Sequence, residues 1–167
     1  MSMIWQRFGR TLAVLEAGRQ RGLHTGAQVY VSRHGDVLLD EGYGEARPGI
    51  PMTRDVLMPW LSAGKPLMAV AVMKLVEQGR LSLQTRIADV LPAFAARGKA
   101  DITLWHVLTH TGGFRNARLN WPHANWSSTI EAVCDAELEA DWVVGHTAGY
   151  HVASSWYVLG ELIRVID

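Results

Sequence analysis

One apolar run with a serine and a lysine at its front end constrains the fold of this chain most strongly. In the segment "MPWLSAGKPLMAVAVMKLVEQGRL", residues 58–81, Ser62 and Lys65 precede a stretch with helical character. We expect this helix to extend over residues 67–78 and to end before Gly79. Because it is apolar on several faces, the pattern predicts burial. It is far shorter than the roughly 20 residues that a membrane span needs, so we expect no membrane protein.

The length of 167 residues suits one domain with a sizeable core, so we expect a single domain over residues 1–167. Its 16 basic and 16 acidic residues are scattered, which argues against partners such as nucleic acid or a membrane surface. The N-terminus "MSMIWQRFGR" lacks the pattern of a secretory signal, and this favours a cytoplasmic location. Cys134 is the only cysteine and is expected to be a packing residue.

Apolar spacing and turn residues outline the rest of the chain. An amphipathic helix is expected before Gly22, followed by a hairpin of residues 27–32 and 37–40 that turns at His34-Gly35-Asp36. The Pro- and Gly-rich stretch "EARPGIPMTRD" predicts a loop. Further helices are expected over residues 104–110, capped by Thr103, over 128–138, with a capping box of Ser128 and Glu131, and over 153–166.

Ser62 and Lys65 have two interpretations. A serine often caps a helix, and a lysine in the first turn is common, so the spacing alone favours a structural role. The alternative is a nucleophile, because residues three apart share one helix face and a lysine of lowered pKa can take a serine proton. The positive end of the helix dipole would then favour a developing oxyanion beside Ser62.

A second stretch favours the nucleophile. "ITLWHVLTHTGGF", residues 102–114, resembles the "ITxxHLLTHTSGL" signature of the serine β-lactamase and penicillin-binding-protein superfamily, in the branch of class C β-lactamases and related esterases. The intervening "LVEQGRLSLQTRIADVLP" resembles that family's "LVEEGKLSLDDPVSKYLP". The resemblance implies that Ser62 is the acylated nucleophile and that Lys65 is its proton-transfer partner.

The family's second catalytic element is a Tyr-x-Asn before a helix, and "GHTAGYHVASSWYVLGELI", residues 145–163, resembles it. Counting from Gly145 places Tyr150 at the tyrosine, whereas counting back from Gly160 places His151 there. We favour Tyr150, because a phenolate beside a lysine ammonium can accept the serine proton, and His151 remains a rival base. The asparagine is absent, since Val152 or Ala153 takes its place.

The resemblance implies a β-lactamase/transpeptidase-like α/β (α+β) fold, with helices packed on an antiparallel sheet that is incomplete here. The family's third element, Lys-Thr-Gly or His-x-Gly on a later strand, has no counterpart after Tyr150. We therefore expect the N-terminal portion of a serine hydrolase, which keeps only the hairpin of residues 27–40. A C-terminal half or a second chain would complete the sheet and supply half of the oxyanion hole.

Other candidate groups have structural interpretations. His106 and His110 lie four apart on a helix, but with no acidic or cysteine partner nearby we expect no metal and no cofactor. Of the seven tryptophans, those at 121, 126 and 142 belong either to the core or to a substrate cleft. The expected function is hydrolysis or acyl transfer of a small-molecule ester or amide through an acyl-enzyme on Ser62. The alternative is a non-catalytic binding or scaffold module.

Overall fold

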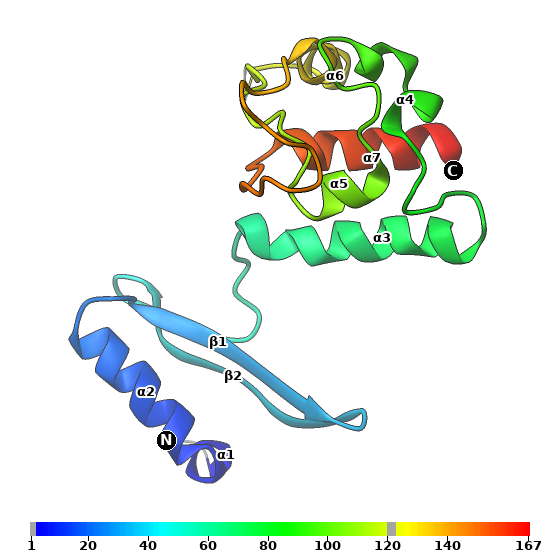
Figure 1. Cartoon of the computed structure of the whole chain (residues 1–167). Coiled ribbons are helices and arrows are strands. Elements are labelled where there is room, and N and C mark those ends of the chain that lie inside the picture. The colour runs from blue at the N-terminus through cyan, green and yellow to red at the C-terminus, as the bar shows by residue number, and fades with distance from the viewer. Residues whose placement is uncertain (1–2, 120–122) are drawn as a thin grey trace. The chain divides into compact units, whose positions relative to one another are not determined.

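The computed structural model describes residues 3–119 and 123–167, with side chains from Trp5 onward. The chain forms two compact units, Met1–Pro59 and Trp60–Asp167. Each unit has its own cluster of buried apolar side chains. Figure 1 labels the α-helices of both units and the strands β1 and β2. The single domain expected over residues 1–167 stays a prediction.

The first unit packs a helical segment on a small antiparallel sheet. Its elements are α1 (Met3–Arg7), α2 (Gly9–Gln20), β1 (Gly26–Arg33), β2 (Asp36–Arg47) and β3 (Ile50–Pro51), in the sheet order β1-β2-β3 (Figure 1). The expected single helix is divided at Phe8. Trp5, Leu12 and Leu39 form the centre of the core between helices and sheet.

The hairpin between β1 and β2 has the predicted turn. His34 and Gly35 both have positive φ, of 52° and 90°, which is the geometry that a two-residue hairpin loop prefers. The loop expected from "EARPGIPMTRD" is wrong in part, because residues 45–47 continue β2 and residues 50–51 pair with them. Gly49, at φ 77°, turns the chain between them, so the sheet has three strands rather than two.

The second unit consists of helices around one core. They are the 3₁₀ turn η1 (Leu61–Gly64), α3 (Lys65–Glu77), α4 (Ile87–Val90), the 3₁₀ turn η2 (Pro92–Ala95), α5 (Leu104–Leu108), α6 (Trp126–Asp135) and α7 (Ser154–Ile166). α7 contacts α3, α4, α5 and α6, and its Val158, Leu159 and Leu162 are buried (Figure 1). Cys134 is buried in this core, as expected.

Two expectations for this unit are corrected. α3 buries only Val72 and Leu75, while Leu67, Val70 and Met73 are exposed, so its apolar character does not mean burial on several faces. Asn125, and not Ser128, caps α6: its side chain accepts the Ser128 N–H at 2.9 Å, and the helix ends at Asp135. Thr103 caps α5 as predicted. In the described part of the chain, no helix is long and apolar enough to cross a membrane.

Candidate active site

Ser62 is not a helix cap. It lies in the 3₁₀ turn η1, and the residue at the N-cap position of α3 is Gly64, which makes no side-chain cap. The Ser62 hydroxyl instead contacts Lys65 and Tyr150. Leu61, directly before the serine, has a φ of 47°, a strained conformation for a bulky residue. The serine therefore projects from a tight turn, exposed and available for contacts outside the helix.

Lys65 is the first residue of α3 and lies one turn beyond the serine. Its Nζ donates to Ser62 Oγ at 3.3 Å and to the backbone carbonyl of Val152 at 2.9 Å. The same atom lies 5.0 Å from the ring centroid of Tyr150 and 5.2 Å from that of Trp156. The ammonium is thus fixed between the start of α3 and the segment that leads into α7.

Tyr150 completes the cluster, although it lies 88 residues after the serine. Its hydroxyl donates to Ser62 Oγ at 2.6 Å. Bonding and positive charge from Lys65, with the Ser62 hydrogen bond, lower the pKa of the Tyr150 phenol below its ordinary value. Of the two registers that the sequence allows, only Tyr150 reaches the serine.

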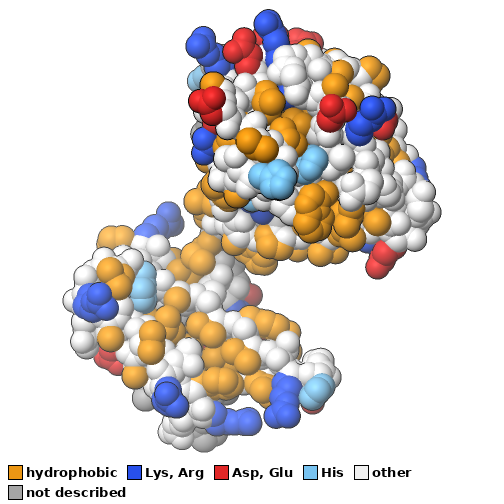
Figure 2. All heavy atoms as spheres, viewed as in Figure 1, with side chains coloured by type: hydrophobic (Ala, Val, Ile, Leu, Met, Phe, Trp, Pro, Cys, Tyr) orange, Lys and Arg blue, Asp and Glu red, His pale blue; other side chains and the backbone are white. Residues whose placement is uncertain are grey.

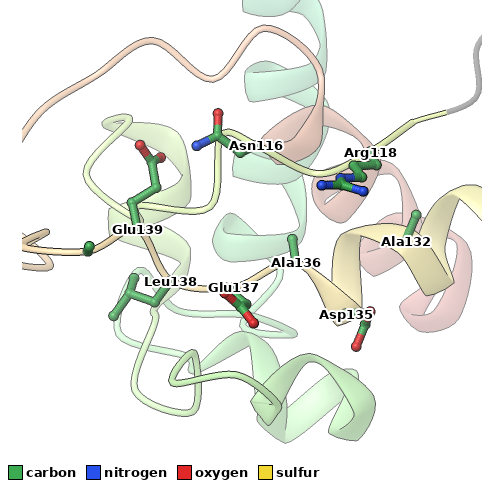
Figure 3. Close-up of a pocket in the computed structure, with 9 residues that line it drawn as sticks. Asn116, Arg118, Ala132, Asp135, Ala136, Glu137, Leu138 and Glu139 are labelled. Atoms are coloured by element: carbon green, nitrogen blue, oxygen red, sulfur yellow. The ribbon is translucent and has the colours of Figure 1, made fainter.

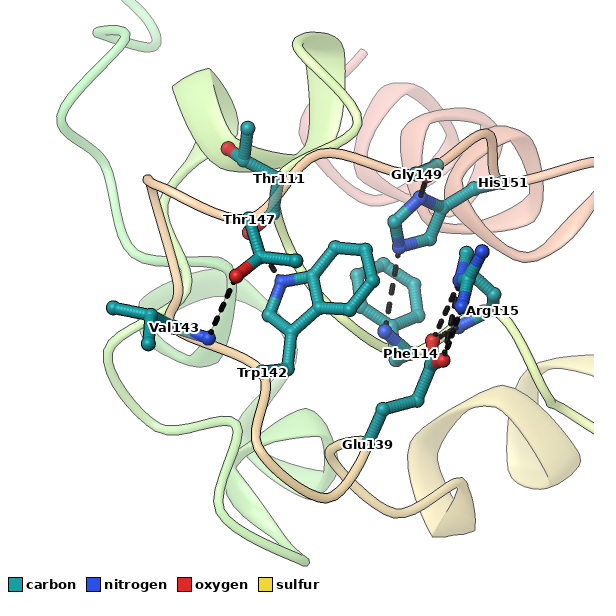
Figure 4. A network of polar contacts seen from close by, with 9 residues as sticks. All are labelled: Thr111, Phe114, Arg115, Glu139, Trp142, Val143, Thr147, Gly149 and His151. Atoms are coloured by element: carbon teal, nitrogen blue, oxygen red, sulfur yellow. Dashed lines mark hydrogen bonds and ion pairs between the residues drawn. The ribbon is translucent and has the colours of Figure 1, made fainter.

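His151 points away into a buried network (Figure 4). The histidine is fully buried; its Nε2 accepts the Phe114 N–H at 3.3 Å, and its Nδ1 bonds the Gly149 carbonyl at 2.8 Å. Burial lowers the pKa of His151 to about 4, so the ring is neutral near pH 7. With both ring nitrogens engaged, His151 is a poor base for Ser62.

His110 links this network to Tyr150. Its Nδ1 accepts the His151 backbone N–H at 3.1 Å, and its ring centroid lies 4.9 Å from that of Tyr150. Burial, and then the charge on Lys65, lower the pKa of His110. The His110 carbonyl also accepts the Gly149 N–H at 3.0 Å. The signature around His110 therefore holds the backbone on both sides of Tyr150.

An ion pair that the sequence analysis missed closes the network. Arg115 and Glu139 form a paired contact with a shortest distance of 2.6 Å, and Glu139 is largely buried (Figure 4). Arg115 also lies 4.9 Å from the Trp142 ring, whose Nε1 donates to the Thr111 carbonyl at 3.0 Å. Trp142 thus belongs to this network, and its ring also lies 6.0 Å from that of His151, centroid to centroid. No spacing rule links residues 24 apart, so only the fold reveals the pair.

His106 and His110 each accept a backbone hydrogen bond within this unit. His106 Nδ1 accepts the Thr103 N–H at 3.1 Å in the cap of α5, and His110 Nδ1 is bonded to His151. Within the described residues, no group of three or more His, Cys, Asp or Glu side chains could hold a metal ion.

The described residues of this unit line a cavity next to the cluster and a wider one elsewhere. One of about 330 Å³ adjoins the cluster, because Leu61 and Lys65 line it together with Trp126 and Trp156. A wider cavity of about 710 Å³ lies along the end of α6 and is lined by Asn116, Arg118 and residues 135–140 (Figure 3). Neither Ser62, Lys65 nor Tyr150 lines the second cavity, so the first is the one relevant to the cluster.

Comparison with known families identifies the family of this chain. The profile of the Beta-lactamase family matches residues 13–167, and the chain belongs to this family. Esterase EstB of Burkholderia gladioli is 38% identical over 104 residues, which are 59% of this chain and 26% of the esterase. Esterase/β-lactamase LipL of Mycobacterium tuberculosis is 26% identical over 162 residues, which are 94% of this chain and 36% of LipL. The chain therefore spans about a quarter to a third of these relatives.

Solved structures show the same fold. A family VIII carboxylesterase superposes with a TM-score of 0.81 at 26% identity, over 95% of this chain and 44% of the esterase. A penicillin-binding-protein homologue from Caulobacter crescentus superposes with a TM-score of 0.75 at 28% identity, over 96% of this chain and 44% of that protein. The fold is thus β-lactamase-like and penicillin-binding-protein-like, as predicted, and covers less than half of either neighbour.

Proposed function

We propose that this chain carries the nucleophile of a serine hydrolase or acyltransferase that acts on a small-molecule ester or amide through an acyl-enzyme on Ser62. One observation carries the proposal: the Tyr150 hydroxyl lies 2.6 Å from Ser62 Oγ, and Lys65 Nζ lies 3.3 Å from the same oxygen. Hydrolytic relatives such as esterase EstB support the reaction class.

In the proposed mechanism, Tyr150 is the base and Lys65 its counter-charge. The Tyr150 phenolate takes the Ser62 proton as Oγ attacks the substrate carbonyl carbon. The tetrahedral intermediate collapses, Tyr150 returns the proton to the leaving alcohol or amine, and the acyl group stays on Ser62. Water or another alcohol then attacks the acyl-enzyme by the same proton route in reverse. Lys65 stabilises the phenolate through its positive charge.

Further polypeptide is part of this proposal. Among the described residues no strand follows β3, whereas the family resemblance assigns half of the oxyanion hole to a later strand. Leu67, Val70 and Met73 form an exposed apolar stripe on α3, and hydrophobic side chains show at the surface there (Figure 2). We propose that the sheet-completing strands, from a C-terminal half or a second chain, cover this stripe. A melt of this chain that the added strands leave unshifted would contradict that part.

Labelling with a fluorophosphonate tests the nucleophile. We expect one equivalent of probe on Ser62, found by mass spectrometry of the digested protein, and no label in Ser62→Ala. Ser127→Ala is the matched control, because Ser127 is an exposed serine that bonds Glu131 and lies outside the cluster. Absence of label from the native chain, also after addition of the missing strands, would overturn the proposal in favour of a non-catalytic module.

The pH dependence of labelling tests the base. Since the pKa of Tyr150 is lowered, the labelling rate should rise with pH and level off below the ordinary tyrosine value of about 10. Tyr150→Phe should remove this rise and slow labelling on the order of 100-fold or more, as expected for loss of a general base. An unchanged profile in Tyr150→Phe would exclude the phenol as the base.

A further inference from the structure

We propose that the 330 Å³ cavity beside Lys65 binds the acyl portion of the substrate, and that the substrate class is an ester with an uncharged aryl or medium-length alkyl acyl group. This inference rests on the proposed function, because it assigns the acyl side of the same site. Trp126 is the specificity-determining residue in this proposal.

The lining of the cavity is apolar and aromatic. Its walls include Leu61, Met68, Trp126, Val152, Trp156 and Tyr157, and Lys65 is the only charged residue among the described residues that line it. The Lys65 ammonium would repel a cationic acyl group, and any charged group would lose hydration on entering this apolar cavity. An apolar surface with one polar edge is typical of small-molecule sites and favours an uncharged hydrocarbon group.

The cavity lies beside the nucleophile, although Ser62 itself does not line it. Leu61, directly before Ser62 in η1, and Lys65, the first residue of α3, both line it. Val152 lines it from the other side and accepts the Lys65 Nζ through its carbonyl. The resemblance places an asparagine at this position in related enzymes, so an apolar side chain here replaces a polar amide. An acyl group attached to Ser62 therefore has an apolar wall within reach.

A hydrogen bond to the buried carboxylate of Glu161 fixes Trp126 in the cavity wall. Trp126 Nε1 donates to Glu161 Oε2 at 2.6 Å, and Arg164 donates to both carboxylate oxygens at 2.7 Å. Glu161 is buried, with only 7% of its surface exposed. The indole also lies 5.5 Å from the Tyr157 ring, centroid to centroid. Placing a carboxylate in an apolar core is costly, and this one holds the indole in one orientation.

Gly160 provides the space that this orientation needs. A Cβ atom at Gly160 would lie 2.9 Å from Trp126 Cη2, closer than real Cβ contacts allow. The glycine in α7 therefore lets the edge of the indole ring approach the helix backbone closely, next to Met68, whose methyl lies 3.8 Å from the same Cβ position. A preorganised indole wall selects ligands by shape at low entropic cost.

The cavity has room for more than an acetyl group. An enclosed apolar cavity of about 150 Å³ holds a benzene ring, and this cavity of about 330 Å³, which is open to solvent on one side, has room for a ring with a short linker or an alkyl chain of about six to eight carbons. We expect acetyl esters to leave the cavity unfilled. Burying each added methylene is expected to strengthen binding about three- to fourfold, until the cavity is full.

Binding of unreactive ketones to Ser62→Ala tests the cavity without any turnover. The probes are butan-2-one, hexan-2-one, heptan-2-one and 4-phenylbutan-2-one, and binding is followed through the indole N–H signals in two-dimensional NMR. We expect shifts of the Trp126 and Trp156 signals and an affinity that rises three- to fourfold per methylene. Affinity that does not change with chain length, or shifts confined to other tryptophans, would overturn the proposal.

Variants distinguish ketone binding in the cavity from nonspecific hydrophobic binding elsewhere on the protein. Ala153→Leu fills the cavity from a lining position and should weaken 4-phenylbutan-2-one binding about tenfold or more, as should Trp126→Ala. Trp105→Ala is the matched control, because Trp105 is 48% exposed, close to the 44% of Trp126, yet lies on α5 and does not line the cavity. Equal losses in Trp105→Ala and Trp126→Ala would contradict the assignment.

The ester series distinguishes failure of this inference from failure of the proposed function. With p-nitrophenyl acetate, butyrate, hexanoate and octanoate, kcat/KM should rise with chain length in the native chain and stay flat in Ala153→Leu. Turnover that does not depend on chain length would contradict the acyl cavity and leave the proposed serine hydrolase intact. Ketone binding without any labelling of Ser62 would contradict the proposed hydrolase and leave a binding cavity.

Discussion

The helices α3 and α7 both contain 13 residues, both are rich in apolar side chains, and each follows one part of the candidate site, yet they are buried to different extents. α7 buries six residues along one broad face, including Val158, Leu159 and Leu162. α3 buries only Val72 and Leu75. The apolar composition of a helix therefore predicts that the helix packs against something. It does not show whether this chain itself supplies that packing surface.

The two helices also differ in their polar contacts. Before and along α7, buried polar groups such as His151 and Glu161 are bonded within the unit. On α3, the side chains opposite the core are Leu67, Val70 and Met73, three residues apart, which form one stripe on a helix surface. In our proposal this stripe is apolar because further strands cover it, so its truncation should have little effect on the present chain alone.

Truncation of one leucine on each helix gives the largest expected difference. Leu159→Ala on α7 removes a fully buried side chain and should lower the free energy of unfolding by about 3–4 kcal/mol. Leu67→Ala on α3 removes a side chain that is 63% exposed and should change it by less than about 0.5 kcal/mol. Urea unfolding of both variants measures the difference. Comparable losses would show that α3 is already packed against something.

Protonation of His151, in the segment before α7, gives the next largest expected effect on the free energy of unfolding. Its pKa is about 4 in the folded protein, because of burial, and about 6.5 in an unfolded chain, so the unfolded state binds more protons between these values. Stability is complete above pH 6.5 and should fall by up to about 3 kcal/mol as the pH drops towards 4. His106 and His110, also with lowered pKa values, contribute in the same direction.

The measurement is the unfolding free energy at several pH values between 7 and 5. His151→Gln should be less stable at pH 7 and should show a shallower decline, whereas the exposed His146→Gln should keep the full decline. If the unfolding free energy of His151→Gln falls with pH as steeply as that of the native chain, this histidine is not the main source of the acid sensitivity.

Glu161 should have a smaller effect. Arg164, and also Trp126, lower the pKa of this carboxyl, so its stabilisation is present above the ordinary value of about 4.3 and is lost as the pH falls below it. Because Arg164 is 63% exposed and screened by solvent, we expect Glu161→Gln to cost only about 1 kcal/mol at pH 7. Thermal melts at pH 7 and pH 4 should differ less in this variant than in the native chain. Glu131→Gln, at an exposed position, is the control.

Much of this fold could be predicted from local chemistry. Thr103 at the start of α5, Gly79 after α3 and the His34-Gly35 turn are signals that act within a few residues, and each is present in the structure. The third strand was missed, because residues 50–51 follow a Pro-Gly pair that also suits a loop. The Asn125 cap was missed because Ser128 and Glu131 have the same spacing as a capping box.

The candidate site likewise has a part that local sequence rules predict and a part that depends on the tertiary fold. Ser62 and Lys65 are one turn apart, so their proximity follows from helix geometry alone. Tyr150 was found through the family resemblance, since no local rule joins residues 88 apart. The Arg115–Glu139 pair and the Trp126–Glu161 contact carry no sequence signal, because they depend on how α6 and the following loop pack on α7.

Substitution of Gly64, directly before α3, gives the smallest expected effect on the free energy of unfolding. Gly64 stands between Ser62 and Lys65, where the family resemblance favours a threonine, and its φ of −75° is compatible with any residue. A Cβ atom there meets nothing within 4 Å. Gly64→Ala should therefore raise the unfolding free energy by about 0.5–1 kcal/mol, mainly by reducing the freedom of the unfolded chain. Fluorophosphonate labelling should stay within about twofold of native, because the substitution leaves Ser62, Lys65 and Tyr150 in place. A strong loss of labelling with retained stability would mean that the backbone at Gly64 must move during acylation, and so that the start of α3 is less rigid than the start of α7.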